Sequence, residues 1–387
     1  MIKILFLVGK GGDVYPTKTT SKKAPTWLRK TAKQFEDFIN YDGSVPSDVA
    51  MAMYMAYHHP RDEFVCIVGD EVQSKKDLDY FDVVYVIYDA IEVFHGGACG
   101  GKTCPIERKK MERAVSTTSA FVYPYPKFHK YIIVKPSYYS ELRRAGLPVA
   151  PFFKITPTTA LKSISSFRKR VEKKGWKGVI VKPSYAGYSL GIKVYKSFAR
   201  TKDKTIRKSF QVLEDRGFPS ATIQEFIPSF GDHYEIRTYW LNGRYAYSIG
   251  TLTKEIWGGD SGGLPIDDED TFVSEGGSIP DRLKKKLQIL GRQVQKALRQ
   301  YPYKHPLLRI DFGCCLATSA DCQDTYFINE VETMAANFLA EDTTFPIVEK
   351  AARALYTFAQ KVKGKKEPKG RKSTFKVKKA PCVSGSS

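Results

Sequence analysis

Short apolar segments alternate with amphipathic ones along the first third of the chain. The segments at 2–8, 64–68 and 83–87 are rich in Val, Ile, Leu and aromatic residues and are bounded by glycine-rich or charged turns. This pattern is typical of buried strands. Between the first two segments, apolar residues from Trp27 to Ile39 recur at helical spacing. Strands separated by helices predict a parallel α/β layer.

The pattern changes near Val115, where a second unit begins. A helix over 135–145 is predicted because Gly146 and then Pro148 follow it and together form a helix stop signal. The pair Asn242-Gly243 predicts a tight hairpin, since residues of this type accept the positive φ of such a turn. Strands are expected at 178–182, 192–195, 222–227, 234–241 and 245–251.

The last third is predicted to complete the fold with two strands and two helices. Glycine and acidic residues in 258–277 favour a mobile loop, after which Ser278-x-x-Asp281 opens a helix. We expect 307–311 and 326–331 to form a central strand pair, and 345–362 to form the closing helix. The apolar face of the first helix comprises Leu283, Leu287, Leu290, Val294 and Leu298.

Composition narrows the class of protein. The chain has 387 residues, of which 42% are hydrophobic and 13% aromatic, which suits two or three folded domains and excludes a mainly disordered chain. No apolar run approaches the ~18–20 residues that span a bilayer, and 2–8 is too short for a signal-peptide core. We therefore expect a cytoplasmic protein without a membrane partner. The seven cysteines lack paired zinc-ligand spacing, which favours reduced thiols.

The formal charge of +21 is unevenly distributed along the sequence. Ten Lys/Arg and one Glu lie between Lys361 and Ser387, in a segment with few apolar residues, which predicts a disordered basic arm. Two interpretations of this arm stay open. It is either a solubility or targeting tail or a contact for a polyanion such as nucleic acid or an acidic protein.

A lysine at the end of a predicted buried strand gives the first chemical signal. Lys182 follows Val179-Ile180-Val181 and precedes the small, glycine-containing loop 183–191. Its ammonium can hold a polyphosphate as a point charge, while backbone N–H groups and hydroxyls of the loop contact the same anion. Taken alone, this signal is weak.

Two further predicted strands carry carboxylates. Because side chains alternate along a strand, Glu330 and Glu332 lie on one face, and Asp311 joins them if its strand is the neighbour. Three buried carboxylates need a compensating cation, and hard oxygen ligands favour Mg2+ or Mn2+. Apolar flanks make a set of exposed acids on edge strands the weaker alternative.

These motifs occur in the order found in a known superfamily. From about Phe121 to Val362 the chain resembles the ATP-grasp superfamily, and within it D-alanine–D-alanine ligases and ribosomal-protein glutamate ligases. The resemblance implies an α/β (α+β) chain with the ATP-grasp fold, in which two lobes sandwich ATP, preceded by a Rossmann-like parallel α/β domain. The implied units are the N-terminal pre-ATP-grasp α/β domain at 1–115, the central lobe at 116–222, the C-terminal catalytic lobe at 223–362 and the disordered basic tail at 363–387.

The resemblance also implies roles for individual residues. The segment 224–227 resembles the hinge that holds adenine through backbone groups, Glu235 matches the ribose-binding acid, and Lys182 with its cover loop matches the phosphate site. The implied ATP-binding residues are Lys135, Lys182, Ser184, Gly187, Ser189, Gln224, Glu225, Ile227 and Glu235. The implied catalytic residues are Lys254, which reaches the terminal phosphate, and Arg309, which stabilises an oxyanion, and the implied metal ligands are Asp311, Glu330 and Glu332.

Two features depart from the family pattern. The last metal ligand is commonly Asn in these ligases but is Glu332 here, which adds a negative charge to the site. A polar insertion at 317–324, which resembles an extended hairpin, separates the carboxylate-bearing segments.

The implied activity is an ATP- and Mg2+-dependent (or Mn2+-dependent) ligation of a carboxylate to an amine. The γ-phosphoryl group passes to the carboxylate while Lys182, Lys254 and Arg309 neutralise its charge, and an amine then attacks the acylphosphate. The expected carboxylate belongs to a small amino acid, a peptide or a protein. Closure of 258–277 over the site would exclude water.

Other signals compete with this interpretation. Residues 96–103 match the P-loop pattern G-x-x-x-x-G-K-T, which keeps a P-loop NTPase open as an alternative. A kinase of the same fold that phosphorylates a polyol phosphate is a second one, since a basic surface suits an acidic substrate. The basic stretches 162–177 and 196–208 are most simply solvated faces. Interleaved aromatic residues leave nucleic-acid stacking as an alternative there; they are Phe167, Trp176 and Phe210.

Overall fold

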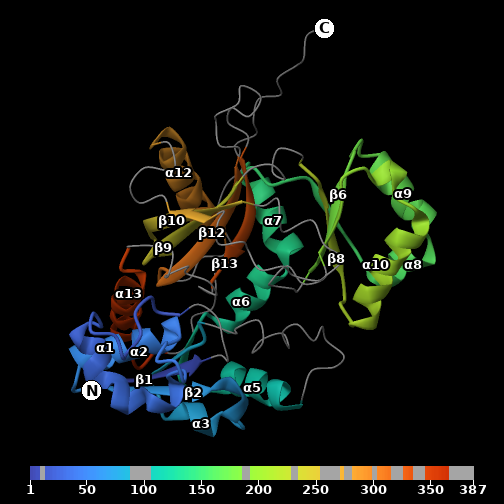
Figure 1. Cartoon of the computed structure of the whole chain (residues 1–387). Helices are drawn as coiled ribbons and strands as arrows, with labels where there is room; N and C mark the ends of the chain where they lie inside the picture. Colours follow the sequence, from blue (N-terminus) through green and yellow to red (C-terminus); the bar gives the residue numbers. More distant parts are fainter. Residues whose placement is uncertain are drawn as a thin grey trace.

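The chain forms three β-sheets in the part that the structure, a computed structural model, describes (Figure 1). The described residues are 1–8, 14–87, 106–184, 192–227, 234–252, 271–273, 281–298, 303–314, 326–333 and 345–365. Several predicted features therefore lie outside them: Gly187, Ser189, Lys254, the motif at 96–103, the insertion at 317–324 and the tail from residue 366.

The N-terminal sheet is entirely parallel, as the alternating pattern predicted. Its strands are β1 (Lys3–Val8), β2 (Glu63–Val68), β3 (Val83–Tyr85) and β4 (Phe121–Tyr123), in the order β2-β1-β3-β4. Parallel neighbours need crossover connections, and short helices supply them here. These helices are α1 (Thr26–Thr31), η1 (Ala32–Phe38), α2 (Ser47–His58), η2 (Gly69–Glu71), α3 (Lys76–Asp79) and α5 (Ile106–Thr117).

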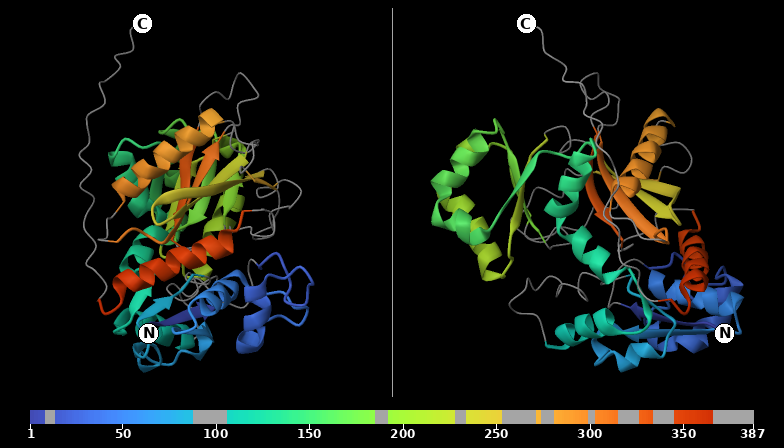
Figure 2. Two further views of the ribbon diagram at one scale, coloured as in Figure 1. Left: turned by 90° about the vertical axis from the view of Figure 1, so that its left-hand side faces the viewer. Right: turned by 180° about the vertical axis from the view of Figure 1, so that it is seen from behind.

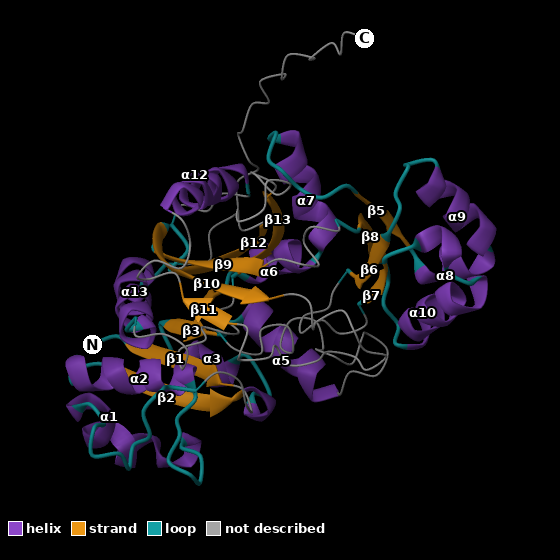
Figure 3. Cartoon of the chain, turned by 45° about the horizontal axis from the view of Figure 1, so that its top comes forward, coloured by secondary structure: helices purple, strands orange, loops and turns teal. Residues whose placement is uncertain are grey.

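The second sheet is antiparallel and carries its helices on one face. Its strands are β5 (Phe152–Ile155), β6 (Val179–Pro183), β7 (Lys193–Tyr195) and β8 (Ala221–Glu225), in the order β5-β8-β6-β7. From here on, the name central lobe refers to residues 151–227, which contain this sheet and its helices, rather than to the predicted unit at 116–222. Its helices form a layer on the side away from the rest of the molecule (Figures 1 and 3). They are α8 (Pro157–Lys162), α9 (Ile164–Glu172), η4 (Phe198–Arg200) and α10 (Asp203–Asp215).

The third sheet is antiparallel and corrects two expectations. Strand β11 (Thr271–Val273) pairs with β10 inside the segment 258–277, which was predicted to be a mobile loop. The strands expected to form a central pair do pair with each other, but β13 lies at the sheet edge in the order β11-β10-β9-β12-β13. The remaining elements of this lobe are β9 (Tyr234–Leu241), β10 (Arg244–Leu252), α12 (Asp281–Ala297), β12 (Leu307–Cys314), β13 (Tyr326–Glu332) and α13 (Ile347–Val362).

Two local signals have the expected backbone geometry. Asn242 and Gly243 adopt φ values of 49° and 75° at the turn between β9 and β10, as a tight hairpin requires. Helix α7 (Lys135–Arg144) has Pro136 in its first turn and ends before Gly146, whose φ is 74°. This helix, with α6 (Pro126–Ile133) before it, lies between the two antiparallel sheets (Figures 1 and 2).

The central lobe has a hydrophobic core of its own. The N-terminal and C-terminal sheets instead share one continuous core, which includes the predicted apolar face of α12. In the central lobe, Phe167, Trp176 and Phe210 all belong to the core, and none is more than 9% exposed. The alternative in which these aromatic rings offer a stacking surface for nucleic acid is therefore wrong.

Helix α13 ties the C-terminal part of the chain to the N-terminal sheet. It packs against α2, and Arg353 donates a hydrogen bond from Nε to the Tyr54 hydroxyl at 2.6 Å. The Tyr15 hydroxyl donates to Glu349 at 2.7 Å, and the Tyr85 hydroxyl donates to the carbonyl of Leu355 at 2.5 Å. Figure 2 shows α13 between the N-terminal helices and the C-terminal sheet. These two parts are therefore held together, while the central lobe stands apart.

The strand pairing bears on where the chain divides. The predicted boundary after residue 115 falls inside α5, and the one after residue 222 falls inside β8. Because β4 pairs with β3, and β8 pairs with β5 and β6, we propose boundaries after Tyr123 and after Ile227. Among the described helices, none combines the length and the apolar composition needed to cross a membrane.

Candidate functional site

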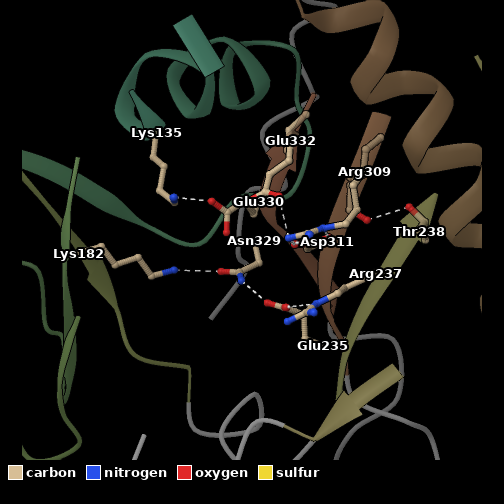
Figure 4. Close-up of polar contacts among 12 residues, drawn as sticks. Lys135, Lys182, Glu235, Arg237, Thr238, Arg309, Asp311, Asn329, Glu330 and Glu332 are labelled. Atoms are coloured by element: carbon tan, nitrogen blue, oxygen red, sulfur yellow. Dashed lines mark hydrogen bonds and ion pairs between the residues drawn. The ribbon is translucent and has the colours of Figure 1, made fainter. Parts of the chain in front are cut away.

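Charged side chains gather where the central sheet faces the C-terminal sheet (Figure 4). Strand alternation explains why they point the same way. On β6, Val179 and Val181 face the core of the central lobe, so Lys182 faces the opposite side. Ile236 of β9 and Ile310 of β12 pack in the shared core. The residues on either side of each isoleucine therefore point the other way, toward the central lobe. These are Glu235, Arg237, Arg309 and Asp311.

The register of three strands sets the carboxylates beside one another. Asp311 of β12 lies opposite Arg237 of β9 on one side and Glu330 of β13 on the other. Arg309 lies opposite Glu332. The expectation that Asp311 occupies the strand next to the two glutamates is therefore confirmed.

A β-bulge adds a residue that the sequence analysis did not single out. The pairing shifts between Asp311, opposite Glu330, and Phe312, opposite Ile328, which leaves Asn329 unmatched. The Asn329 amide accepts a hydrogen bond from Lys182 Nζ at 3.0 Å and donates one to Glu235 at 2.5 Å. Asn329 therefore links the central sheet to the C-terminal sheet. Period-two alternation assigns it to the face opposite its neighbour Glu330, so the sequence carried no signal for this role.

Each carboxylate of the C-terminal sheet is near a cation of the same protein. Arg309 donates to Asp311 from Nε at 2.9 Å and from Nη2 at 2.8 Å, and Nη2 lies 3.0 Å from Glu332. Arg237 Nε lies 3.1 Å from Glu235. Lys135, at the start of α7, forms an ion pair with Glu330. With Lys182, four cations accompany four carboxylates, so the cluster is close to neutral.

Burial decides how these groups titrate. Burial raises the pKa of Asp311 to about 6 and that of Glu332 to about 7, because the favourable charge of Arg309 offsets it only in part. Burial alone would also raise the pKa of Glu330, but the positive charges of Lys135, Arg309 and Lys182 together outweigh it, and the pKa lies below its ordinary value. Burial lowers the pKa of Lys182 to about 8.

The three carboxylates fit a divalent cation by their chemistry. Oε2 of Glu332 is buried and accepts no hydrogen bond among the described residues, since Arg309 approaches it without hydrogen-bond geometry. The raised pKa values of Asp311 and Glu332 mean that their charge is incompletely compensated, and hard oxygen donors suit Mg2+ or Mn2+. In the described ranges, however, no three His, Cys, Asp or Glu side chains are already arranged around a metal position. A cation would therefore replace Arg309 and Lys135 as the partner of these acids.

Gln224 of the central lobe is a buried polar side chain whose hydrogen-bonding groups are unsatisfied among the described residues. It lies on β8, opposite Ile180 of β6, and is on the same sheet face as Lys182. Its side chain is 1% exposed, and neither its Oε1 nor its Nε2 has a hydrogen-bond partner in the described part of the chain. A buried amide without partners costs about 1–3 kcal/mol. An amide left in this state points to a ligand that supplies one donor and one acceptor.

The other expected residues have less distinctive surroundings. Ser184 is fully buried, and its hydroxyl lies 3.4 Å from that of Thr222. Glu225 is half-buried, which raises the pKa of its carboxyl, and its backbone N–H donates to the carbonyl of Pro151. Ile227 packs in a small cluster with Ala150 and Phe327, between the two sheets.

The chain was compared with known proteins by sequence and by structure. No protein-family model matches it, and no curated protein matches its sequence. The D-cycloserine synthetase DcsG superposes with a TM-score of 0.61 over 94% of this chain and 100% of its own, at 14% identity. VanG D-Ala:D-Ser ligase from Enterococcus faecalis gives a TM-score of 0.56 over 93% and 100%, at 11% identity. D-alanyl-alanine synthetase A from Vibrio cholerae gives 0.56 over 93% and 98%, at 13% identity.

These likenesses concern architecture, since the identities are low. They extend over nearly the whole chain and over nearly the whole of each solved structure. The parallel N-terminal sheet, the two antiparallel sheets that face each other and the order of the elements all agree with the fold implied by the sequence motifs. The chain has the ATP-grasp fold of D-alanine–D-alanine ligases.

Proposed function

We propose that the protein is an ATP- and Mg2+-dependent carboxylate–amine ligase that forms an amide through an acylphosphate and releases ADP and phosphate. One observation carries the proposal. In a fold shared with ligases, the buried Lys182 of one lobe faces strands of the other lobe that carry Asp311, Glu330 and Glu332. The substrates would be a small-molecule or protein carboxylate and an amine.

The central lobe supports the nucleotide half of this proposal. Among the described residues, Lys182 donates one hydrogen bond, to the neutral amide of Asn329. Its positive charge is therefore available to phosphate. Gln224 offers one donor and one acceptor on the same sheet face. Adenine presents a matching acceptor and donor at N7 and N6, the edge that Gln pairs with in bidentate fashion elsewhere. Glu235, on the opposite sheet, would accept the ribose hydroxyls.

The C-terminal lobe supports the metal half. Asp311, Glu330 and Glu332 would hold Mg2+, which when bound neutralises phosphate charge and orients the γ-phosphoryl group. Arg309, released from Asp311 and Glu332, would then contact the ligands. Lys135 would turn to the nucleotide.

The residues then divide the reaction between them. The substrate carboxylate attacks the γ-phosphorus, the bond from that phosphorus to the β–γ bridging oxygen breaks, and ADP leaves while Lys182 holds the phosphate charge. An amine attacks the acylphosphate carbonyl, and the guanidinium of Arg309 stabilises the oxyanion until phosphate departs. The amine loses a proton as the amide forms. Lys254, Gly187 and Ser189, outside the described residues, stay predictions for this site.

Binding measurements test where the nucleotide sits. Calorimetric titration of ATP with MgCl2 would compare the wild type with Lys182→Ala, Lys102→Ala and Lys169→Ala. We expect binding to weaken at least about tenfold only in Lys182→Ala, because a charge-assisted contact to phosphate is lost. The control Lys169→Ala removes an exposed lysine of the same lobe. Loss in Lys102→Ala alone would assign the nucleotide to 96–103 and contradict the proposal.

A second titration tests Gln224. Gln224→Leu should weaken ATP binding about tenfold, because it removes both polar contacts to the base. Binding of inosine triphosphate, whose base lacks the N6 amine, should already be weak in the wild type and change little in the variant. Equal losses for both nucleotides would mean that Gln224 does not contact the N6 edge.

Trapping separates a ligase from a kinase. A ligase releases ADP only when a carboxylate and an amine are both present, or when hydroxylamine takes the place of the amine and yields a hydroxamate. A kinase acting on a polyol phosphate releases ADP with a hydroxyl acceptor and forms no hydroxamate. ADP release of the second kind would contradict the ligase and favour the kinase alternative.

A further inference from the structure

The net charge of the protein is concentrated in two segments. The central lobe, residues 151–227, contains seventeen Lys/Arg and five Asp/Glu, a net charge of +12. The segment 361–387 contributes +9. The remaining residues hold 35 basic and 35 acidic side chains and are neutral. The basic character of the protein is therefore a property of one folded lobe and one terminal segment.

Most of the basic side chains of the lobe are exposed and lack an acidic partner. Apart from the buried Lys182, they are exposed or half-buried. Within the described residues of the lobe, Arg168 with Asp203 at 2.5 Å is the single ion pair. The Glu214 carboxylate accepts hydrogen bonds from Thr158, and the Asp215 carboxylate accepts one from Gln211. The few acids on this surface therefore leave most of the positive charge uncompensated.

The charges line the outer helical layer. On α9 and the turn after it, Lys169 and Lys173 are spaced by one helical turn, and on α10 so are Lys204 and Lys208. The two helices pack against each other through the rings of Phe167 and Phe210. All four lysines are exposed. We call the surface of α9, α10 and the connection 196–202 the basic face.

The basic face and Lys182 lie on opposite sides of the central sheet. The sheet of the central lobe separates α9 and α10 from Lys182, and the views in Figures 1 and 2 agree on this arrangement. A polyanion on the basic face would therefore not be the group that reaches the reactive centre. It would anchor the protein rather than serve as its substrate.

The composition of the face favours phosphate over protein. Protein interfaces have an apolar centre and are depleted in lysine, whereas nucleic-acid contacts are polar and strongly positive. The large exposed hydrophobic side chains of the described residues are Met1, Tyr41, Tyr80 and Ile289, and none of them lies in the central lobe. In the part of the lobe that the structure describes, the aromatic rings are buried, so this part of the surface offers no platform for stacking unpaired bases.

We propose that the basic face binds the phosphate backbone of double-stranded nucleic acid without sequence preference. A duplex carries one negative charge per about 1.7 Å of its axis, a density that suits lysines on two packed helices. Binding would release counterions, so the affinity should fall steeply with salt. The contact holds the central lobe near a nucleic acid and leaves the sheet face that carries Lys182 open to other ligands.

Fluorescence anisotropy with a labelled mixed-sequence DNA duplex tests the proposal on the full-length chain. The first variant reverses the charges of the basic face by Lys169→Glu, Lys173→Glu, Lys204→Glu and Lys208→Glu. The matched control carries the same number of reversals on the neutral part of the chain, Lys23→Glu, Lys33→Glu, Lys76→Glu and Lys285→Glu, all exposed in the wild type. The two variants have the same net charge, and ATP binding in both reports that the site around Lys182 is folded.

The basic-face variant should bind the duplex at least about tenfold more weakly than the control at 0.1 M salt, and the slope of log K against log salt should fall by about 3. Three outcomes would overturn the proposal. Equal weakening in both variants would mean that only net charge matters. Binding that depends on neutralising the lysines of 361–387 but not on the basic face would assign the contact to the terminal segment. Tighter binding of a polyglutamate peptide than of the duplex would replace nucleic acid with an acidic protein.

Discussion

The two antiparallel sheets that face each other are built alike but carry different charges. Each packs one face against helices and turns the other toward the opposite sheet. In the described part of the central sheet, Lys182 is the one buried charged side chain. The C-terminal sheet presents six charged groups on that face, and each lies within ion-pair distance of an opposite charge.

The two sheets differ in the partners of their buried charges. Among the described residues, Lys182 donates its one hydrogen bond to the neutral amide of Asn329, so no carboxylate hydrogen-bonds to its ammonium there. The carboxylates of the C-terminal sheet are instead paired with arginine and lysine. These ion pairs compensate part of their charge without a metal, and a bound metal ion would take the place of the arginine and lysine. In the proposed function, the central sheet would therefore contact phosphate and the C-terminal sheet would hold a divalent cation.

Removing one cation from each sheet gives the largest contrast. Arg309→Met should lower the free energy of unfolding by about 3–5 kcal/mol, because Asp311 and Glu332 both lose the guanidinium that pairs with them. Lys182→Met should cost less than about 1 kcal/mol, since no carboxylate loses its partner. Urea unfolding in EDTA measures both. Adding Asp311→Asn and Glu332→Gln to Arg309→Met should recover most of the loss. Equal costs for the two single variants would contradict the contrast.

The pH dependence of stability tests the incomplete compensation of the acids. A carboxyl whose pKa is raised on folding, to about 7 for Glu332, favours the folded state below its unfolded pKa of about 4.5 and loses that contribution as pH rises toward 7. Glu332→Gln should therefore gain about 2–3 kcal/mol relative to the wild type between pH 4.5 and pH 8. Chemical unfolding in EDTA at a series of pH values measures this. A difference that does not change with pH would mean that the carboxyl is fully compensated.

Helix α12 approaches the C-terminal sheet very closely at one glycine. A Cβ atom on Gly291 of α12 would lie 2.1 Å from the ring of Trp240 on β9. Gly291→Ala should therefore destabilise the protein by about 1–3 kcal/mol, although the same change in an open helix stabilises by about 1 kcal/mol. Thermal or urea unfolding measures the sign. Combining it with Trp240→Phe should reduce the cost, and additive effects would mean that the two residues do not compete for space.

The smallest expected effect concerns Lys182, the buried cation in the described part of the central sheet. Since burial lowers the pKa of Lys182 to about 8, free protein loses this charge above that pH. ATP affinity should fall about tenfold between pH 7 and pH 9 in the wild type. Lys182→Arg should bind more weakly at pH 7 but show a flat profile, because arginine keeps its proton. Parallel profiles would assign the pH dependence to another group.

Alternation and turn chemistry were readable from the sequence because they are local. Period-two spacing put Glu330 and Glu332 on one face of a strand, and the pair Asn242-Gly243 marked a turn that only such residues adopt easily. The alternating strands and helices indicated the parallel sheet. Together with the order of the motifs, these signals were enough for the ATP-grasp fold.

What only the tertiary structure decided depends on contacts between distant segments. The bulge at Asn329 arises from the register between β12 and β13, so strand alternation assigned this residue to the wrong face. The pairing of β11 with β10 likewise needed a partner strand in place. The lysine pattern of α9 and α10 became a single outer face only once the aromatic rings between the charges packed inward. Local chemistry sets which way a side chain points along its own element, but the neighbours it meets depend on how the elements pack.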